Sequence, residues 1–236
     1  MTRRRWIADE VSGNHAALTG DHARHLAQVL RARVGAEFDI SIGTEVRRGK
    51  VISLHPERVE FELGEVIPVP PAAQITVALS IFKFDRMEWA IEKATELGVS
   101  QIVPVVAARS ESHLASASHK RVERWRRIAK QAAEQSRRVL APDVTNPVKL
   151  NELLSMSAHL RIVLSESEDK LMLKDALPAQ SQSLLLAFGP EGGWKEQELA
   201  AFREYTWISA SLGNTILRAE TAVVAAIAIV SSLLDR

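Results

Sequence analysis

Two glycine-bearing segments carry the residue types best suited to holding a small polar ligand. They are residues 188–194, which read FGPEGGW, and residues 212–222, which read LGNTILRAETA. Each follows an apolar run typical of a strand, and each precedes a helical pattern. Glycine permits positive φ angles and lets another group approach the backbone closely. Two such strand ends lying together predict a cleft whose walls are main-chain donors and acceptors.

The second segment places charge in an apolar setting. Arg218, Glu220 and Thr221 are flanked on both sides by aliphatic residues. A charged side chain beside the start of a buried helix should be either paired or functional. In one interpretation Arg218 pairs with Glu220 or Glu191 and only orders the loop. In the other, Arg218 lies at the mouth of a ligand cleft, with Glu220 and Thr221 near the N-terminus of the helix.

Other catalytic patterns are missing. No G-x-S-x-G, H-E-x-x-H or G-x-x-x-x-G-K-[ST] pattern occurs, which weakens hydrolase, zinc-protease and P-loop interpretations. Residues 188–194 also lack the G-x-G-x-x-G spacing, and Pro190 removes an amide donor, so a Rossmann loop fits poorly. His22 and His25 lie three residues apart without a third ligand at a convincing spacing. We therefore expect no metal, and a polar or RNA-facing role for these histidines.

Composition places the chain among ordinary globular proteins. Of its 236 residues, 46% are hydrophobic and 25% are charged, the net charge is +1, and cysteine is absent. Disulfides and thiolate metal sites are therefore excluded. Asp9 and Glu10 follow the basic start at once, which leaves no apolar signal-peptide core. The longest apolar run, 221–234, is shorter than the ~20 residues of a membrane span, so we expect a cytoplasmic protein outside the membrane.

Positive charge is concentrated in one stretch. Residues 119–138 hold eight Lys or Arg residues against only Glu123 and Glu134. This excess indicates either a phosphate-binding surface or a solvated helix face, and the charge pattern alone favours neither.

The pattern of elements changes near residues 68–71, a proline-rich stretch that breaks strands. Residues 1–70 combine one short helix with short alternating strands, which predicts a compact β-barrel and a plausible RNA-binding module. Residues 73–236 alternate strands with helices, which predicts an α/β domain with a parallel sheet. The expected strands of this second domain lie at 75–82, 102–106, 160–165, 184–188 and 206–209, and the expected helices at 85–98, 118–136, 195–204 and 221–234.

Several segments together resemble one known family, and they are spread over most of the chain. They are His25 with residues 29–31 and Gly35, Lys83 with Asp85 and Arg86, residues 91–99 (IEKATELGV), Pro104, Arg109 with Ser110, Glu134 with Gln135, Ser136 and Arg138, and the two glycine-bearing segments. On these residues the chain is similar to the ribosomal RNA small subunit methyltransferase E family, within the SPOUT superfamily of RNA methyltransferases.

The resemblance implies a particular fold and cofactor. A SPOUT domain has a C-terminal chain that threads through a loop into a deep trefoil knot, and in this family a PUA-like RNA-binding barrel precedes it. The resemblance also implies a homodimer with the knot at its interface, and S-adenosylmethionine held in a bent shape by three loops. The implied cofactor-binding residues are Leu164, Ser165, Glu166, Phe188, Gly189, Pro190, Glu191, Gly192, Gly193, Leu212, Gly213, Asn214, Ile216, Leu217, Arg218, Thr221 and Ala222.

The implied reaction is methylation of N3 of a uridine in 16S rRNA, on the assembled small ribosomal subunit. The N3–H of uracil is weakly acidic, so the site must accept that proton and stabilise negative charge on O2 and O4. We expect Arg218 to stabilise this charge and Glu191 or Glu220 to act as the base. The residues expected to hold RNA are Arg3, Arg4, Arg5, His25, Arg31, Lys83, Arg86, Arg109 and Arg138.

Two positions depart from the family pattern. The family usually has Arg where this chain has Thr215, so one positive charge near the cleft is missing. Trp194 and Lys195 follow the GPEGG turn in place of Phe and Ser, so the next helix lacks a hydroxyl N-cap. We expect activity to survive both changes. The alternatives are a non-catalytic rRNA-binding or assembly factor, and a SPOUT methyltransferase that acts on another RNA.

Overall fold

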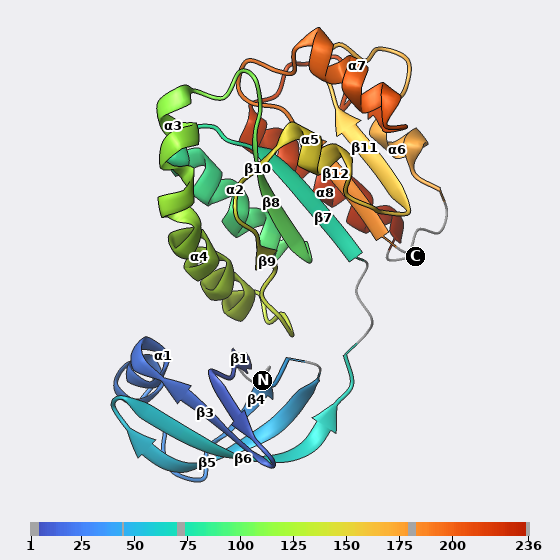
Figure 1. Ribbon diagram of the computed structural model, residues 1–236. Helices are drawn as coiled ribbons and strands as arrows, with labels where there is room; N and C mark the ends of the chain where they lie inside the picture. Colours follow the sequence, from blue (N-terminus) through green and yellow to red (C-terminus); the bar gives the residue numbers. More distant parts are fainter. Residues whose placement is uncertain (1–4, 44, 70–73, 179–182, 235–236) are drawn as a thin grey trace. The chain divides into compact units, whose positions relative to one another are not determined.

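The computed structural model describes residues 5–43, 45–69, 74–178 and 183–234 (Figure 1). The chain divides into two compact units. Unit 1 comprises residues 1–71 together with residues 133–141, and unit 2 comprises residues 72–132 and 142–236. The first unit is therefore assembled from two segments that lie far apart in the sequence.

Unit 1 is built on one sheet and a short helical segment. Its elements are β1 (Arg5–Ile7), β2 (Glu10–Ser12), β3 (His15–Thr19), helices α1 (Gly20–Arg24) and η1 (His25–Val29), β4 (Glu37–Ser41), β5 (Val46–His55) and β6 (Arg58–Ile67). The strand order is β1-β4-β5-β6-β3-β2, so β1 and β2 are the edges of the sheet in the described part of the chain. Only the β1–β4 pair is parallel. The strands expected for a compact barrel form one mainly antiparallel sheet, and no strand pair among the described residues joins its two edges.

Alternation along β6 shows how the sequence builds this core. Val59, Phe61 and Leu63 are almost fully buried, whereas the residues between them are exposed or half-buried. Side chains on a strand point alternately to its two faces, so these three share the face that packs on Leu26 and Trp6.

Residues 133–141 pack against the rest of unit 1 through backbone carbonyls as well as side chains. Arg5 donates a hydrogen bond to the carbonyl oxygen of Arg137, and the hydroxyl of Ser41 donates one to the carbonyl oxygen of Val139. These contacts join β1 and β4 to the end of the basic stretch that the sequence singles out.

His22 forms the ionic part of the same attachment. Its Nδ1 lies 3.2 Å from Oδ2 of Asp9, and its Nε2 lies 3.2 Å from Oε2 of Glu134. Hydrogen bonds to Asp9 and then Glu134 raise the pKa of His22 from 6.5 to about 9, because both carboxylates favour the protonated ring. His22 is therefore a cation near neutral pH. Of the two histidines noted in the sequence, His22 therefore has a structural role within unit 1.

Unit 2 alternates strands with helices. Its elements are β7 (Gln74–Ser80), α2 (Phe84–Glu96), β8 (Gln101–Val106), α3 (Ser112–Ala117), η2 (Ser118–Arg121), α4 (Val122–Gln135, whose last residues belong to unit 1), β9 (Asp143–Val144), β10 (Val148–Lys149), α5 (Leu150–Leu154), β11 (Leu160–Leu164), α6 (Leu173–Ala176), β12 (Ser183–Phe188), α7 (Glu196–Glu204), β13 (Ile208–Ala210) and α8 (Ala219–Leu234). All neighbouring strands pair in parallel, in the order β10-β8-β7-β12-β11-β13, with β9 beside β8. The predicted α/β domain with a parallel sheet is confirmed.

Both faces of this sheet are covered by helices (Figure 1). On one face Leu184, Leu186 and Phe188 of β12 pack in a cluster with buried residues of α2, α4 and α8. On the other face Leu185 and Ala187 belong to a cluster with residues of α5 and α7. Burial on both sides explains why β12 reads as a continuous apolar run rather than an alternating one.

Candidate functional site

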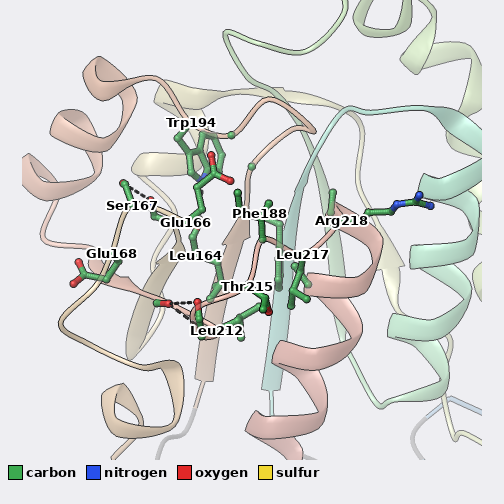
Figure 2. Close-up of a pocket in the computed structure, with 18 of the residues that line it drawn as sticks. Leu164, Glu166, Ser167, Glu168, Phe188, Trp194, Leu212, Thr215, Leu217 and Arg218 are labelled. Carbon is green, nitrogen blue, oxygen red and sulfur yellow. Dashed lines mark hydrogen bonds between the residues drawn. The ribbon is translucent and has the colours of Figure 1, made fainter.

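The loops that follow β11, β12 and β13 line one pocket of about 790 Å³ (Figure 2). β11 pairs with both β12 and β13 in parallel register, so the carboxyl ends of the three strands lie at the same edge of the sheet. Ligands of open α/β sheets usually bind at such an edge. The start of α2 and the first turn of α8 complete the lining.

The pocket brings together most of the residues that the sequence predicts for the cofactor. Those that line it are Leu164, Ser165, Glu166, Phe188, Gly189, Pro190, Glu191, Gly193, Leu212, Gly213, Asn214, Ile216, Leu217, Arg218 and Ala222. Gly192 and Thr221 are not among the lining residues. Lining residues that were not predicted for the cofactor are Lys83, Arg86, Ser167, Glu168, Asp169, Met172, Trp194, Ser211, Thr215 and Ala219.

Trp194 ties the loop after β12 to the end of β11. Its indole Nε1 donates a hydrogen bond of 3.1 Å to the carbonyl oxygen of Leu164, and the side chain is only 7% exposed. A Cβ atom on Gly189 would lie 3.2 Å from that Nε1, so the indole packs closely on the glycine. The amide of Gly193 donates to the carbonyl oxygen of Pro190 at 2.8 Å and closes the turn.

The loop after β11 lies alongside the end of β13. The amide of Ser211 donates to the carbonyl oxygen of Leu171 at 2.9 Å. Glu168 accepts hydrogen bonds from the amides of Lys170 and Leu171, and the bond from Lys170 is the main cause of the lowered pKa of Glu168. Glu168 thus stays ionised at the edge of the pocket. No local pattern in the sequence marks this loop, because its contacts come from β13.

Arg86 connects the pocket wall to two acidic residues. It forms an ion pair with Glu191 of the glycine loop, and its Nε lies 3.8 Å from Oε1 of Glu220 on α8. Oε2 of Glu220 is buried and has no hydrogen-bond partner in the described part of the chain. Charge complementarity therefore joins α2, the glycine loop and α8 at one point.

Arg218 immediately precedes α8, and its carbonyl oxygen accepts a hydrogen bond from the amide of Ala222. Its side chain is exposed and forms no hydrogen bond or ion pair with the described residues. The pairing with Glu220 or Glu191 that would only order the loop is not formed, since Arg86 contacts both carboxylates. Figure 2 shows the guanidinium of Arg218 pointing away from Trp194 and Leu212.

The start of α7 is capped without a hydroxyl group. Glu198 accepts hydrogen bonds from the amide of Lys195 at 2.8 Å and from the amide of Ala108 at 2.9 Å. The carboxylate of Glu198, at the third helical position, thus satisfies the amide of the N-cap residue Lys195, as the carboxylate of a capping box does. Arg109, which follows Ala108 in the sequence, donates to the carbonyl oxygen of Gly192 at 2.5 Å. The turn after β8 is therefore joined both to α7 and to the glycine loop.

Comparisons with known proteins find matches over most of the chain. Residues 69–231 match the model of an RNA methyltransferase domain, and residues 18–64 match that of an RNA methyltransferase PUA domain. The ribosomal RNA small subunit methyltransferase E of Bacillus subtilis is 32% identical, over 91% of this chain and 89% of its own length. The protein of the same name from Mycobacterium tuberculosis is 32% identical, over 95% and 89%. This chain belongs to the ribosomal RNA small subunit methyltransferase E family.

Solved structures of similar proteins lead to the same family. The small subunit methyltransferase E of Neisseria gonorrhoeae, bound to S-adenosylmethionine, superposes with a TM-score of 0.87 at 30% identity, covering 99% of this chain and 98% of the other. A Legionella pneumophila protein in complex with the same cofactor gives a TM-score of 0.86 at 25% identity, with 98% of each chain covered. The chain therefore shares the fold of these relatives as well as their sequence pattern.

The residues expected to hold RNA in this family member lie in different settings. Arg3 and Arg4 fall outside the described residues. Arg31 is exposed, with a positive φ of 49°, and His25 packs edge-on against Trp6 with ring centroids 5.8 Å apart. Burial lowers the pKa of Arg138, whose side chain is only half exposed.

Neither a membrane-spanning helix nor a metal-binding cluster is found in the described part of the chain. None of its helices is long and apolar enough to cross a membrane. Its His, Asp and Glu side chains form no group of three or more that is arranged to hold a metal ion.

Proposed function

We propose that this protein transfers the methyl group of S-adenosylmethionine to N3 of a uridine in 16S rRNA, on the assembled small ribosomal subunit. The observation that carries the proposal is the pocket formed by the loops after β11, β12 and β13 in a member of this family. The structures of relatives with S-adenosylmethionine support the choice of cofactor.

The residues of the pocket fit this cofactor. Its volume of about 790 Å³ lies within the range of small-molecule sites. Leu164, Phe188 and Leu212 offer apolar contact for an adenine ring. Glu166 and Glu168 add negative charge to the pocket lining, which suits a ligand that carries an ammonium and a sulfonium group. The glycine loop leaves backbone groups accessible for hydrogen bonds.

The protein must also handle the proton and the charge of the target base. When bound, S-adenosylmethionine supplies an electrophilic methyl group. We assign stabilisation of the charge on uracil O2 and O4 to Arg218, whose guanidinium is exposed and unpaired among the described residues. Glu191 and Glu220 are the two candidates to accept the N3 proton. Glu191 lines the pocket and is paired with Arg86, whereas Oε2 of Glu220 has no hydrogen-bond partner among the described residues.

Exposed cations offer contacts for the RNA backbone. Lys83 lines the pocket and is exposed, and Arg31 is exposed on unit 1. On α4 several basic residues are already paired, since Arg124 forms two hydrogen bonds with Glu88 and Arg126 forms one with Glu123. Binding to RNA should therefore weaken with salt, with a slope set by the unpaired cations.

We also propose the trefoil knot and the homodimer of the SPOUT superfamily, with a PUA-like RNA-binding fold for unit 1. The chain leaves the edge strand β13, forms the pocket loop 212–218 and enters α8, which contacts α2 and β12 nearer the middle of the sheet. That path supports a threaded C-terminal segment. Ile216 is 83% exposed and Trp89 on α2 is 44% exposed, which supports burial of this region by a second copy.

The test is to incubate the purified protein with labelled S-adenosylmethionine and small ribosomal subunits that lack the modification, followed by mapping of any methyl group by mass spectrometry. Label on N3 of one 16S uridine is the expected result. Label on another RNA, or another atom, contradicts the substrate assignment. Cofactor binding and subunit binding without any label would favour the non-catalytic assembly factor.

A further inference from the structure

Two arginines with a predicted RNA role are bonded instead to the glycine loop after β12. Nη1 of Arg109 donates to the carbonyl oxygen of Gly192 at 2.5 Å and lies 3.5 Å from that of Trp194. Arg86 forms its ion pair with Glu191 of the same loop. The two arginines come from different elements, the turn after β8 and the first turn of α2.

One peptide group of the loop is held at both its oxygen and its nitrogen, and Arg109 holds the oxygen. The carbonyl oxygen of Gly192 accepts from Arg109, and the amide of the following residue, Gly193, donates to Pro190 at 2.8 Å. A planar trans peptide held at both its oxygen and its nitrogen has little freedom to rotate. The aliphatic stem of Arg109 adds packing, since a Cβ on Gly192 would lie 3.3 Å from its Cδ.

The peptide group between Trp194 and Lys195 is held in the same way. The carbonyl oxygen of Trp194 faces Arg109, and the amide of Lys195 donates to Glu198 at 2.8 Å. Glu191 is restrained through its side chain by Arg86. Restraints therefore act on residues 191–195.

We propose that Arg109 and Arg86 are positioning residues that set the glycine loop in its ligand-binding conformation before the cofactor arrives. Fixing a loop in advance improves affinity by removing the cost of ordering it. This inference rests on the proposed function for the identity of the ligand. Its distinguishing consequence is that the loss of Arg109 weakens the binding of S-adenosylmethionine and leaves RNA binding unchanged.

The experiment compares Arg109→Gln, Arg109→Lys and Arg86→Gln with the unmodified full chain. S-adenosylmethionine affinity is measured by calorimetry, and the affinity for small-subunit RNA is measured without cofactor at several salt concentrations. For Arg109→Gln we expect cofactor affinity to fall about tenfold, the equivalent of about one lost charged hydrogen bond. Arg109→Lys should recover part of this loss, because it keeps a cationic donor for the carbonyl oxygen of Gly192.

Hydrogen exchange gives a readout that needs no ligand. The amides of Gly193 and Lys195 should exchange faster in Arg109→Gln than in the unmodified protein, because their peptide groups have lost a restraint. Arg203→Gln is the matched control, since Arg203 of α7 contacts Glu196 and does not line the pocket. Arg31→Gln serves as the control for RNA affinity.

The outcomes separate this inference from the function on which it rests. If Arg109→Gln binds S-adenosylmethionine normally, keeps slow exchange in the loop and loses RNA affinity with a shallower salt slope, Arg109 is an RNA contact and the inference is overturned. If the unmodified protein binds no S-adenosylmethionine, the proposed function fails, and exchange at Gly193 and Lys195 still decides the positioning role.

Discussion

The indole of Trp194 donates a 3.1 Å hydrogen bond to the carbonyl oxygen of Leu164. This bond joins the loop after β12 to the last residue of β11, so two walls of the pocket are fixed relative to each other. The same indole packs edge-on against Phe202 of α7, with ring centroids 4.9 Å apart. One side chain therefore serves both the apolar core and the polar pocket.

Replacing Trp194 separates these two roles. Trp194→Phe keeps an aromatic ring against Phe202 but leaves the carbonyl oxygen of Leu164 without its donor, so we expect a loss of about 1 kcal/mol in the free energy of unfolding. Trp194→Ala should cost about 3–5 kcal/mol through the cavity it creates. Urea denaturation monitored by far-UV circular dichroism measures both values. Equal losses for the two variants would contradict the division of roles.

Arg218→Ala tests the proposed charge stabiliser. Arg218 is exposed and unpaired among the described residues, so its removal should change the free energy of unfolding by less than about 0.5 kcal/mol. Methyl transfer to small subunits should nevertheless be abolished, because the developing charge on uracil loses its partner. Turnover is followed with labelled S-adenosylmethionine. Near-normal turnover in a folded variant would remove Arg218 from the mechanism.

Gly193→Ala combines backbone strain with a steric clash. The φ angle of Gly193 is +67°, and an added Cβ would lie 2.8 Å from Oε1 of Glu166. We expect a stability loss of about 1–2 kcal/mol and weaker cofactor binding. The double variant Gly193→Ala with Glu166→Ala removes the clash and keeps the strain, so it should regain only part of the stability. Full recovery would show that positive φ at this position is not required.

His22 makes the stability of unit 1 depend on pH. Its pKa is raised to about 9 in the folded protein from an ordinary value of 6.5, so the protonated ring favours folding. That contribution is complete below about pH 6.5 and is lost as the pH rises through about 9. Chemical denaturation of the unmodified protein and His22→Gln between about pH 6 and pH 10 should give curves that converge at high pH. Parallel curves would contradict the ion pairs with Asp9 and Glu134.

The sequence predicts the two glycine-bearing loops of the pocket better than it predicts the third loop, which follows β11. Gly189 and Gly213 each follow an apolar strand, and that local pattern predicts two loops that the structure brings to one pocket. Met172 and Glu168 line the same pocket, yet their loop has no comparable pattern, because contacts with β13 determine its path.

Charge is a weaker guide than spacing. The family resemblance predicts Arg86 and Arg109 as RNA contacts, and the structure shows in addition that each is bonded within the protein. A sequence shows that a cation is present but not whether an acidic side chain or a carbonyl oxygen from a distant element meets it. Strands β1 and β2 have three residues each, which are too few to show an alternating pattern in the sequence.

The attachment of residues 133–141 to unit 1 has a consequence for synthesis of the chain and for hybrid proteins made from segments of two relatives. The carboxylate of Glu134 that binds His22 emerges from the ribosome long after residue 71, so unit 1 gains its last contacts only when much of unit 2 has been made. A hybrid protein that takes residues 1–71 from one relative and the remainder from another would pair an N-terminal sheet with a foreign partner segment. Transplanting both segments together preserves the bridge between Asp9, His22 and Glu134.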